Sequence, residues 1–172
     1  MILYLAGHGT AIDWKYYFLP YELSGESQEA MLKAGVSQEE IMQALVEGVA
    51  ARRVIMLLDS CHSGAVAMVM RGNEEKRATA LISKTAGVHV LAASNYAQSA
   101  LELPGIGHGL FTYALLEGLS GKADENRDNT VIVSELGRYT FTTVKTMSEK
   151  IGREQFPTVD MHGEDFPMAI TP

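Results

Sequence analysis

At 172 residues, with 47% apolar and 20% charged side chains, the chain has the size and composition of one globular domain with a buried core. Its net charge of -7 and the lack of a Lys/Arg stripe argue against a nucleic-acid partner, and no apolar run is long enough to cross a membrane. The chain has a single cysteine, which excludes an internal disulfide and a four-cysteine metal site and favours a reducing, cytoplasmic location.

The N-terminal part is expected to alternate strands with one helix. Residues 2–6 are short and apolar, which predicts a buried strand that ends just before a histidine. The aromatic run at residues 16–21 predicts a strand or hairpin arm ended by proline. Ser37 and Glu40 form a capping-box pattern at the start of a helix. The buried face of this helix is predicted from its apolar spacing: Ile41, Leu45 and Val49.

The next apolar run follows Arg53 and covers residues 54–58; it has no polar alternation and predicts a strand buried on both faces. Small polar residues follow it: Asp59-Ser60-Cys61-His62-Ser63-Gly64. The order strand, helix, strand favours a right-handed crossover between parallel neighbours. We therefore expect Cys61 at the carboxyl edge of the sheet, where open α/β folds place their ligands.

The second half is expected to begin with a loop. Residues 65–86 carry mixed charge without a clear apolar period, which predicts a long mobile connection. A third buried strand at residues 87–93 and a loop at 94–107 follow. Helices are expected at about residues 110–119 and 133–151, and the tail is expected to form a loop and one edge strand.

Cys61 requires a base to become a nucleophilic thiolate, and His8 is the best candidate. Parallel neighbouring strands bring their carboxyl ends to the same edge of a sheet. Gly7 and Gly9 allow a sharp turn and a close approach around the histidine. His62 is worse placed, because adjacent residues in an extended segment point to opposite sides. A buried structural cysteine is the alternative, and the residues alone leave both hypotheses open.

These residues resemble the caspase-like peptidase domain, in particular its metacaspase and bacterial orthocaspase branch. The resemblance rests on Ala6-Gly7-His8-Gly9 and on Leu58-Asp59-Ser60-Cys61-His62-Ser63-Gly64. It extends over nearly the whole chain through four further segments: residues 91–94, 98–102, 108–118 and 133–136. It implies a three-layer α/β fold with a mostly parallel sheet and helices on both faces. It also implies a cysteine endopeptidase in which His8 and Cys61 form a dyad and a thioester is formed with the substrate.

The resemblance implies further assignments. The backbone N–H groups of Gly9 and Cys61 would form the oxyanion hole. Residues 1–64 would carry the dyad, residues 87–172 would correspond to the small subunit, and the connection between them is a region that this family can cut. Its basic residues are candidates for self-cleavage, although a solvated linker explains them equally well: Arg71, Lys76 and Arg77.

The family fold normally begins with a strand and a helix before the histidine strand, and this sequence starts at the histidine strand. Three explanations are open: a fragment or processed chain, which we favour, an additional polypeptide that supplies the N-terminal strand, or a rearranged sheet. Without that strand, a row of unpaired backbone groups would border an apolar core.

Asp59 lies two residues before Cys61 and points to the same side in extended geometry. A carboxylate beside a thiolate is unfavourable unless a cation lies between them, which favours a substrate with Arg or Lys before the scissile bond. Arg is preferred because a guanidinium can pair with a carboxylate through two bonds. The metacaspase-like branch also cuts after basic residues. The alternative is that Asp59 caps a turn through local N–H groups. Ser94 and Asn95 are expected to line the substrate groove.

Residues 124–135 match the calcium-loop pattern, with Asn129 in place of the usual glycine. The candidate ligands are oxygen-bearing side chains: Asp124, Asn126, Asp128 and Glu135. The resembled family often has a similar acidic turn as plain structure, so both hypotheses stay open. The five histidines and one cysteine have no zinc-ligand spacing, and thiol chemistry requires no cofactor.

Three functions compete at this point. The first is an active cysteine endopeptidase acting on proteins or peptides, which retention of both His8 and Cys61 favours. The second is a caspase-like adaptor or pseudoenzyme that works by binding proteins, which the missing N-terminal strand favours. The third is a small α/β ligand-binding domain whose cysteine is incidental.

Overall fold

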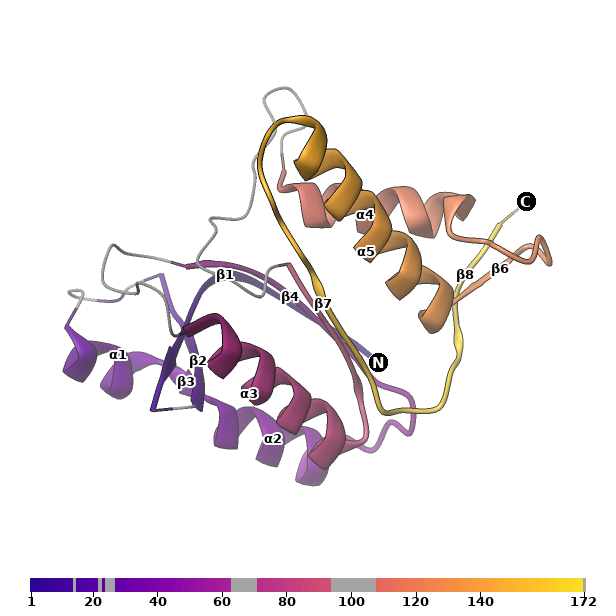
Figure 1. The fold of residues 1–172 in the computed structure, drawn as a ribbon. Coiled ribbons are helices and arrows are strands. Elements are labelled where there is room, and N and C mark those ends of the chain that lie inside the picture. The colour runs from indigo at the N-terminus through magenta and orange to yellow at the C-terminus, as the bar shows by residue number, and fades with distance from the viewer. Residues whose placement is uncertain (14, 22, 24–26, 63–70, 94–107, 172) are drawn as a thin grey trace.

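The computed structural model describes all residues except 14, 22, 24–26, 63–70, 94–107 and 172, and it describes the backbone but not the side chains of residues 60–62 and 71–76. A six-stranded sheet forms the centre (Figure 1). Its strands lie in this order: β3 (Val36–Ser37), β2 (Lys15–Leu19), β1 (Ile2–Ile12), β4 (Ile55–His62), β5 (His89–Ala92) and β7 (Thr158–Met161). A separate two-stranded sheet pairs β6 (Thr130–Ile132) with β8 (Pro167–Ile170).

Helices cover both faces of the central sheet (Figure 1). On one face lie α1 (Gln28–Ala34), α2 (Gln38–Glu47) and α3 (Arg71–Ala86). On the other lie α4 (Leu110–Glu117), which continues into the π-helical turn η1 (Gly118–Lys122), and α5 (Val133–Lys150). Each face has its own apolar core. β1, β4 and β5 are mutually parallel, and the outer strands β2 and β7 run antiparallel to their neighbours. The expected three-layer α/β fold is confirmed.

β1 is longer than predicted. It does not end at Ala6 but continues to Ile12, because its second half pairs antiparallel with β2 from His8↔Leu19 to Ile12↔Lys15. The aromatic hairpin arm before Pro20 is thus confirmed as β2. Position 8 consequently lies inside a strand with a partner on either side.

The prediction of a mobile connection at residues 65–86 is wrong for residues 71–86, which form α3. Of the α3 side chains that are described, at residues 77–86, four are buried on one face of the helix: Ala78, Thr79, Ile82 and Ser83. Two of these four are hydroxyl residues, Thr79 and Ser83, so a search for apolar periodicity detects only two of the four buried positions described. Ser83 satisfies its hydroxyl by donating to the backbone oxygen of Val88 at 2.6 Å.

The helix predicted from Ser37 and Glu40 is confirmed as α2. The Ser37 hydroxyl accepts from the Glu40 N–H at 3.2 Å, and the Glu40 carboxylate accepts from the Ser37 N–H at 2.8 Å. The start of α5 at Val133 also matches its prediction. The tail differs, because it supplies two strands: β7 joins the edge of the main sheet beside β5, and β8 joins the small sheet. None of the helices described combines the length and the apolar character that crossing a bilayer requires.

Candidate active site

The register between β1 and β4 places the two predicted dyad positions side by side. Ala6 pairs with Asp59, and His8 pairs with Cys61. Backbones of neighbouring strands are about 4.8 Å apart, so the two positions are direct neighbours across the ladder. The side chain of Cys61 lies outside the described part of the chain, whereas that of His8 is described and exposed to solvent.

Burial of the first part of β4 explains why the ladder is fixed at this register. Residues 54–58 are buried on both faces, as a central strand of a covered sheet requires. Among the described residues, β5 pairs with β4 as far as Leu58, where the Ala93 N–H donates to the Leu58 carbonyl at 2.8 Å. The β1–β4 ladder therefore continues past the end of β5, and it carries positions 8 and 61 on this projecting part.

Gly9 is held by a close contact with β2. A Cβ atom at this position would lie 2.7 Å from the Tyr16 hydroxyl and 2.8 Å from its ring. Tyr16 is only 2% exposed and belongs to the core beneath the sheet, so its ring has little room to move. The glycine beside His8 is thus explained by this approach of a neighbouring strand, as expected from the sequence.

Asp59 is tied to two other elements. Its Oδ2 atom accepts from the Tyr4 hydroxyl of β1 at 3.1 Å and from the Thr112 hydroxyl of α4. Burial raises the pKa of the Tyr4 phenol, the Thr112 hydrogen bond opposes this rise, and the negative charge of Asp59 adds to it. The described contacts of Asp59 therefore link β4 to β1 and to α4. The alternative of a turn cap stays open, because residues 63–64 of the following turn lie outside the described residues. Sequence reasoning missed both Tyr4 and Thr112.

Other predicted site residues are not gathered here. Ser94 and Asn95 lie outside the described residues. Arg71, Lys76 and Arg77 lie in α3 and not in an irregular connection. His89 is a core residue, as predicted: it is 3% exposed, and its Nε2 lies 2.9 Å from the backbone oxygen of Glu164.

The candidate calcium loop is closed by its own hydrogen bonds. Asp124 accepts from the N–H groups of Asp128 at 3.2 Å and Asn129 at 2.9 Å, and Asp128 accepts from Thr130 at 2.8 Å. The amide oxygen of Asn126 accepts from the Asp128 N–H at 2.9 Å. Asn129 has φ 65°, the left-handed conformation expected where glycine is usual. In the part of the chain that the structure describes, no group of three or more His, Cys, Asp and Glu side chains is arranged to hold a metal ion.

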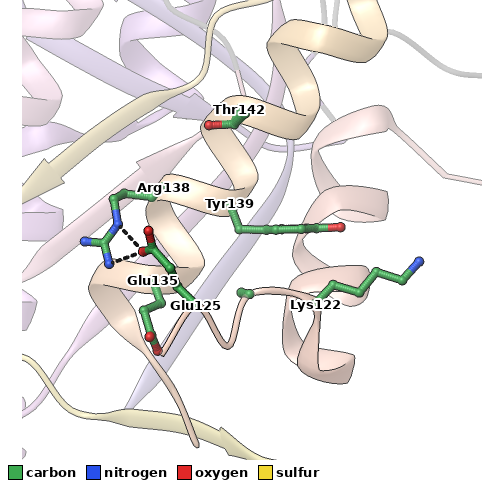
Figure 2. Close-up of a pocket in the computed structure, with 7 residues that line it drawn as sticks. Lys122, Glu125, Glu135, Arg138, Tyr139 and Thr142 are labelled. Atoms are coloured by element: carbon green, nitrogen blue, oxygen red, sulfur yellow. Dashed lines mark hydrogen bonds and ion pairs between the residues drawn. The ribbon is translucent and has the colours of Figure 1, made fainter. Parts of the chain in front are cut away.

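Glu135, the last residue of this pattern, is 3% exposed and accepts from the Ile132 N–H at 3.1 Å. It lines a cavity of about 330 Å³ between the loop and α5 (Figure 2). Within this cavity the Arg138 guanidinium pairs with Glu125 at 2.9 Å, and Figure 2 shows Lys122 extending away from that pair. Lys122 pairs instead with Glu117. Because the cations here are already paired and no residue of β1 or β4 lines the cavity, we assign it no part in the dyad site.

The family model described as the caspase domain matches residues 1–164. A search of curated proteins found no match. Since the family match covers most of the sequence and the fold agrees with it, the chain belongs to the caspase-domain family of cysteine-type peptidases.

Proposed function

We propose that the chain is a cysteine endopeptidase of the metacaspase or orthocaspase branch, in which His8 and Cys61 form the catalytic dyad. One observation carries the proposal: the backbone register makes positions 8 and 61 neighbours on adjacent parallel strands. Both strands alternate sides with a period of two, and their alternation also puts position 61 on the side of Asp59. The base and the nucleophile would thus share one face of the projecting ladder.

In this mechanism His8 takes the proton of the Cys61 thiol, and the thiolate attacks the carbonyl carbon of the scissile peptide bond. The tetrahedral oxyanion is stabilised by the backbone N–H groups of Gly9 and Cys61. Collapse of this intermediate expels the amine, which receives the proton from the imidazolium, and leaves a thioester. Water, deprotonated by the same imidazole, then attacks the thioester and releases the acid product, which restores the thiol.

Substrate choice is assigned to Asp59. Its carboxylate lies two residues from Cys61 on the same strand, about 6.6 Å along an extended chain. A substrate with Arg or Lys before the scissile bond would place a cation beside it, Arg before Lys. Ser94 and Asn95 are proposed to line the groove. A cytoplasmic location is proposed from the cysteine count, since a chain with one cysteine forms no internal disulfide and suits a reducing compartment.

An additional polypeptide is a second part of the proposal. Residues 2–7 of β1 pair with β4 on one side and with no described strand on the other. An apolar cavity of about 270 Å³ adjoins this edge. It is lined mainly by apolar side chains of β1, β2 and α2, among them Leu3, Leu5, Phe18, Ile41 and Leu45. A strand added to this edge would satisfy its backbone groups and cover these side chains.

The adaptor hypothesis also uses this open edge, so the two functions need separate tests. Hydrogen exchange tests the added strand: amides of residues 2–7 that face the open edge should exchange rapidly in the chain alone and slowly in protein purified from its natural host. Rapid exchange in both preparations would contradict an added strand.

Cleavage of fluorogenic peptides tests the enzyme. Peptides ending in Arg, Lys or Asp are incubated with the parent chain and with Cys61→Ala, His8→Ala and His162→Ala. His162→Ala is the matched control, since this histidine is also exposed and follows β7. The proposal predicts cleavage after Arg and Lys by the parent and the control, and none by Cys61→Ala. Equal cleavage by Cys61→Ala and the parent would refute it.

A further inference from the structure

Three side chains from three elements meet on the face of the sheet that α4 covers. Tyr4 comes from β1, Asp59 from β4 and Thr112 from the first turn of α4. The Tyr4 hydroxyl lies 3.1 Å from Asp59 Oδ2 and 2.9 Å from Thr112 Oγ1, and the Thr112 hydroxyl also contacts Oδ2. The three groups thus form a closed ring of hydrogen bonds.

Counting protons shows which atoms the ring uses. An ionised carboxylate only accepts, and each hydroxyl carries one proton. Thr112 donates its proton to Oδ2, so Tyr4 donates to Oδ2 or to Thr112. Oδ2 therefore accepts from Thr112 and, in one of these two arrangements, also from Tyr4, while Oδ1 has no hydrogen-bond partner among the residues described.

The first turn of α4, which carries Thr112, is held firmly by burial. Leu110 and Phe111, which precede Thr112 in α4, are both 0% exposed. They hold the start of the helix against the core formed with β4 and β5.

We propose that Thr112 and Tyr4 are positioning residues that fix the Asp59 carboxylate through Oδ2 and leave Oδ1 for the cationic end of a substrate Arg or Lys. This inference rests on the proposed peptidase function. Because Oδ2 is occupied, a guanidinium cannot use both oxygens freely. The preference for Arg over Lys is therefore small, and it comes from the several N–H groups that a substrate guanidinium can direct at Oδ1 of Asp59.

The test compares a peptide ending in Arg with one ending in citrulline, its neutral analogue of the same shape. Thr112→Val removes the hydroxyl and keeps the side-chain shape. It should raise KM for the Arg peptide about tenfold, the loss expected for a hydrogen bond that orients a charged group. kcat should stay within about twofold, and cleavage of the citrulline peptide should be unchanged. Tyr4→Phe should act in the same direction with a smaller effect.

Thr112→Ser should restore the parent KM, since it keeps the hydroxyl. Thr146→Val, an exposed threonine of α5, serves as the matched control and should change nothing. Equal losses for the Arg and citrulline peptides, or no rescue by Thr112→Ser, would mean that the ring is only structural. The inference would then be wrong while the peptidase proposal stands.

A binding measurement separates the two proposals. In the Cys61→Ala background, fluorescence anisotropy of the labelled peptides reports on the same site without cleavage. Thr112→Val should weaken binding of the Arg peptide about tenfold and leave the citrulline peptide unchanged. If the parent chain cleaves neither peptide but this binding difference is present, the dyad has failed and the positioning role holds. If binding does not depend on the positive charge, the positioning role is refuted.

Discussion

Packing of α3 against the sheet is tested most sharply by two adjacent residues. Ile82 is 0% exposed in the core that α3 shares with β4 and β5, whereas Leu81 is 49% exposed. Ile82→Ala removes three carbons, which costs about 2.4 kcal/mol at about 0.8 kcal/mol for each buried carbon. The cavity left behind raises the expected loss to about 3–4 kcal/mol. Leu81→Ala leaves no enclosed cavity and should cost about 1 kcal/mol or less.

Urea unfolding followed by circular dichroism measures both losses. Limited trypsin digestion adds a second measurement, because Arg77 lies in α3 and should be cut more slowly in the parent than in Ile82→Ala. Losses that are equal for Ile82→Ala and Leu81→Ala would refute the packed helix. That result would favour the original prediction of a mobile connection, in which the self-cleavage candidates Arg71, Lys76 and Arg77 are accessible.

Three further predictions concern the supports of the site and of the fold. Gly9→Ala places a Cβ atom 2.7 Å from the Tyr16 hydroxyl and should lower the free energy of unfolding in urea by about 1–3 kcal/mol. It should also reduce peptide cleavage, and an unchanged urea midpoint would contradict the contact. Asp124→Ala removes the acceptor of two backbone N–H groups and should cost about 1–3 kcal/mol; peptide cleavage by the parent should persist in chelator, and its loss would show that calcium is required. The Ser37 hydrogen bonds lower the pKa of Glu40, so this stabilisation is present above the unfolded pKa of 4.5 and is lost as pH falls through the lowered value; Glu40→Gln should flatten that part of the stability curve, and an identical curve would refute the assignment.

Local signals in the sequence predicted much of the fold. The capping box at Ser37 and the apolar spacing after it identify α2, because both depend on residues within one turn of each other. The uninterrupted apolar run before Asp59 identifies β4, because a strand covered on both faces has no polar side.

Long-range contacts could not be predicted in this way. The second half of β1 is a strand because β2 folds back on it, and the sequence of residues 7–12 does not by itself indicate pairing with β2. The face of α3 that contains Thr79 and Ser83 is buried because neighbouring backbone and side-chain groups accept its hydroxyls, and hydropathy alone does not detect this. The meeting of Tyr4 with Thr112 joins residues 108 positions apart. Sequence spacing carries no signal for such a pair.

Alkylation of the one cysteine tests the central claim most directly, because no other thiol in the chain contributes to the signal. The rate of reaction with iodoacetamide is measured from pH 5 to 9 in the parent and in His8→Ala. If the imidazole of His8 draws the proton from Cys61, the parent should react at least about tenfold faster than the variant at pH 6. Identical rates across the whole pH range would show that the two side chains do not interact, and the account of the dyad would be wrong.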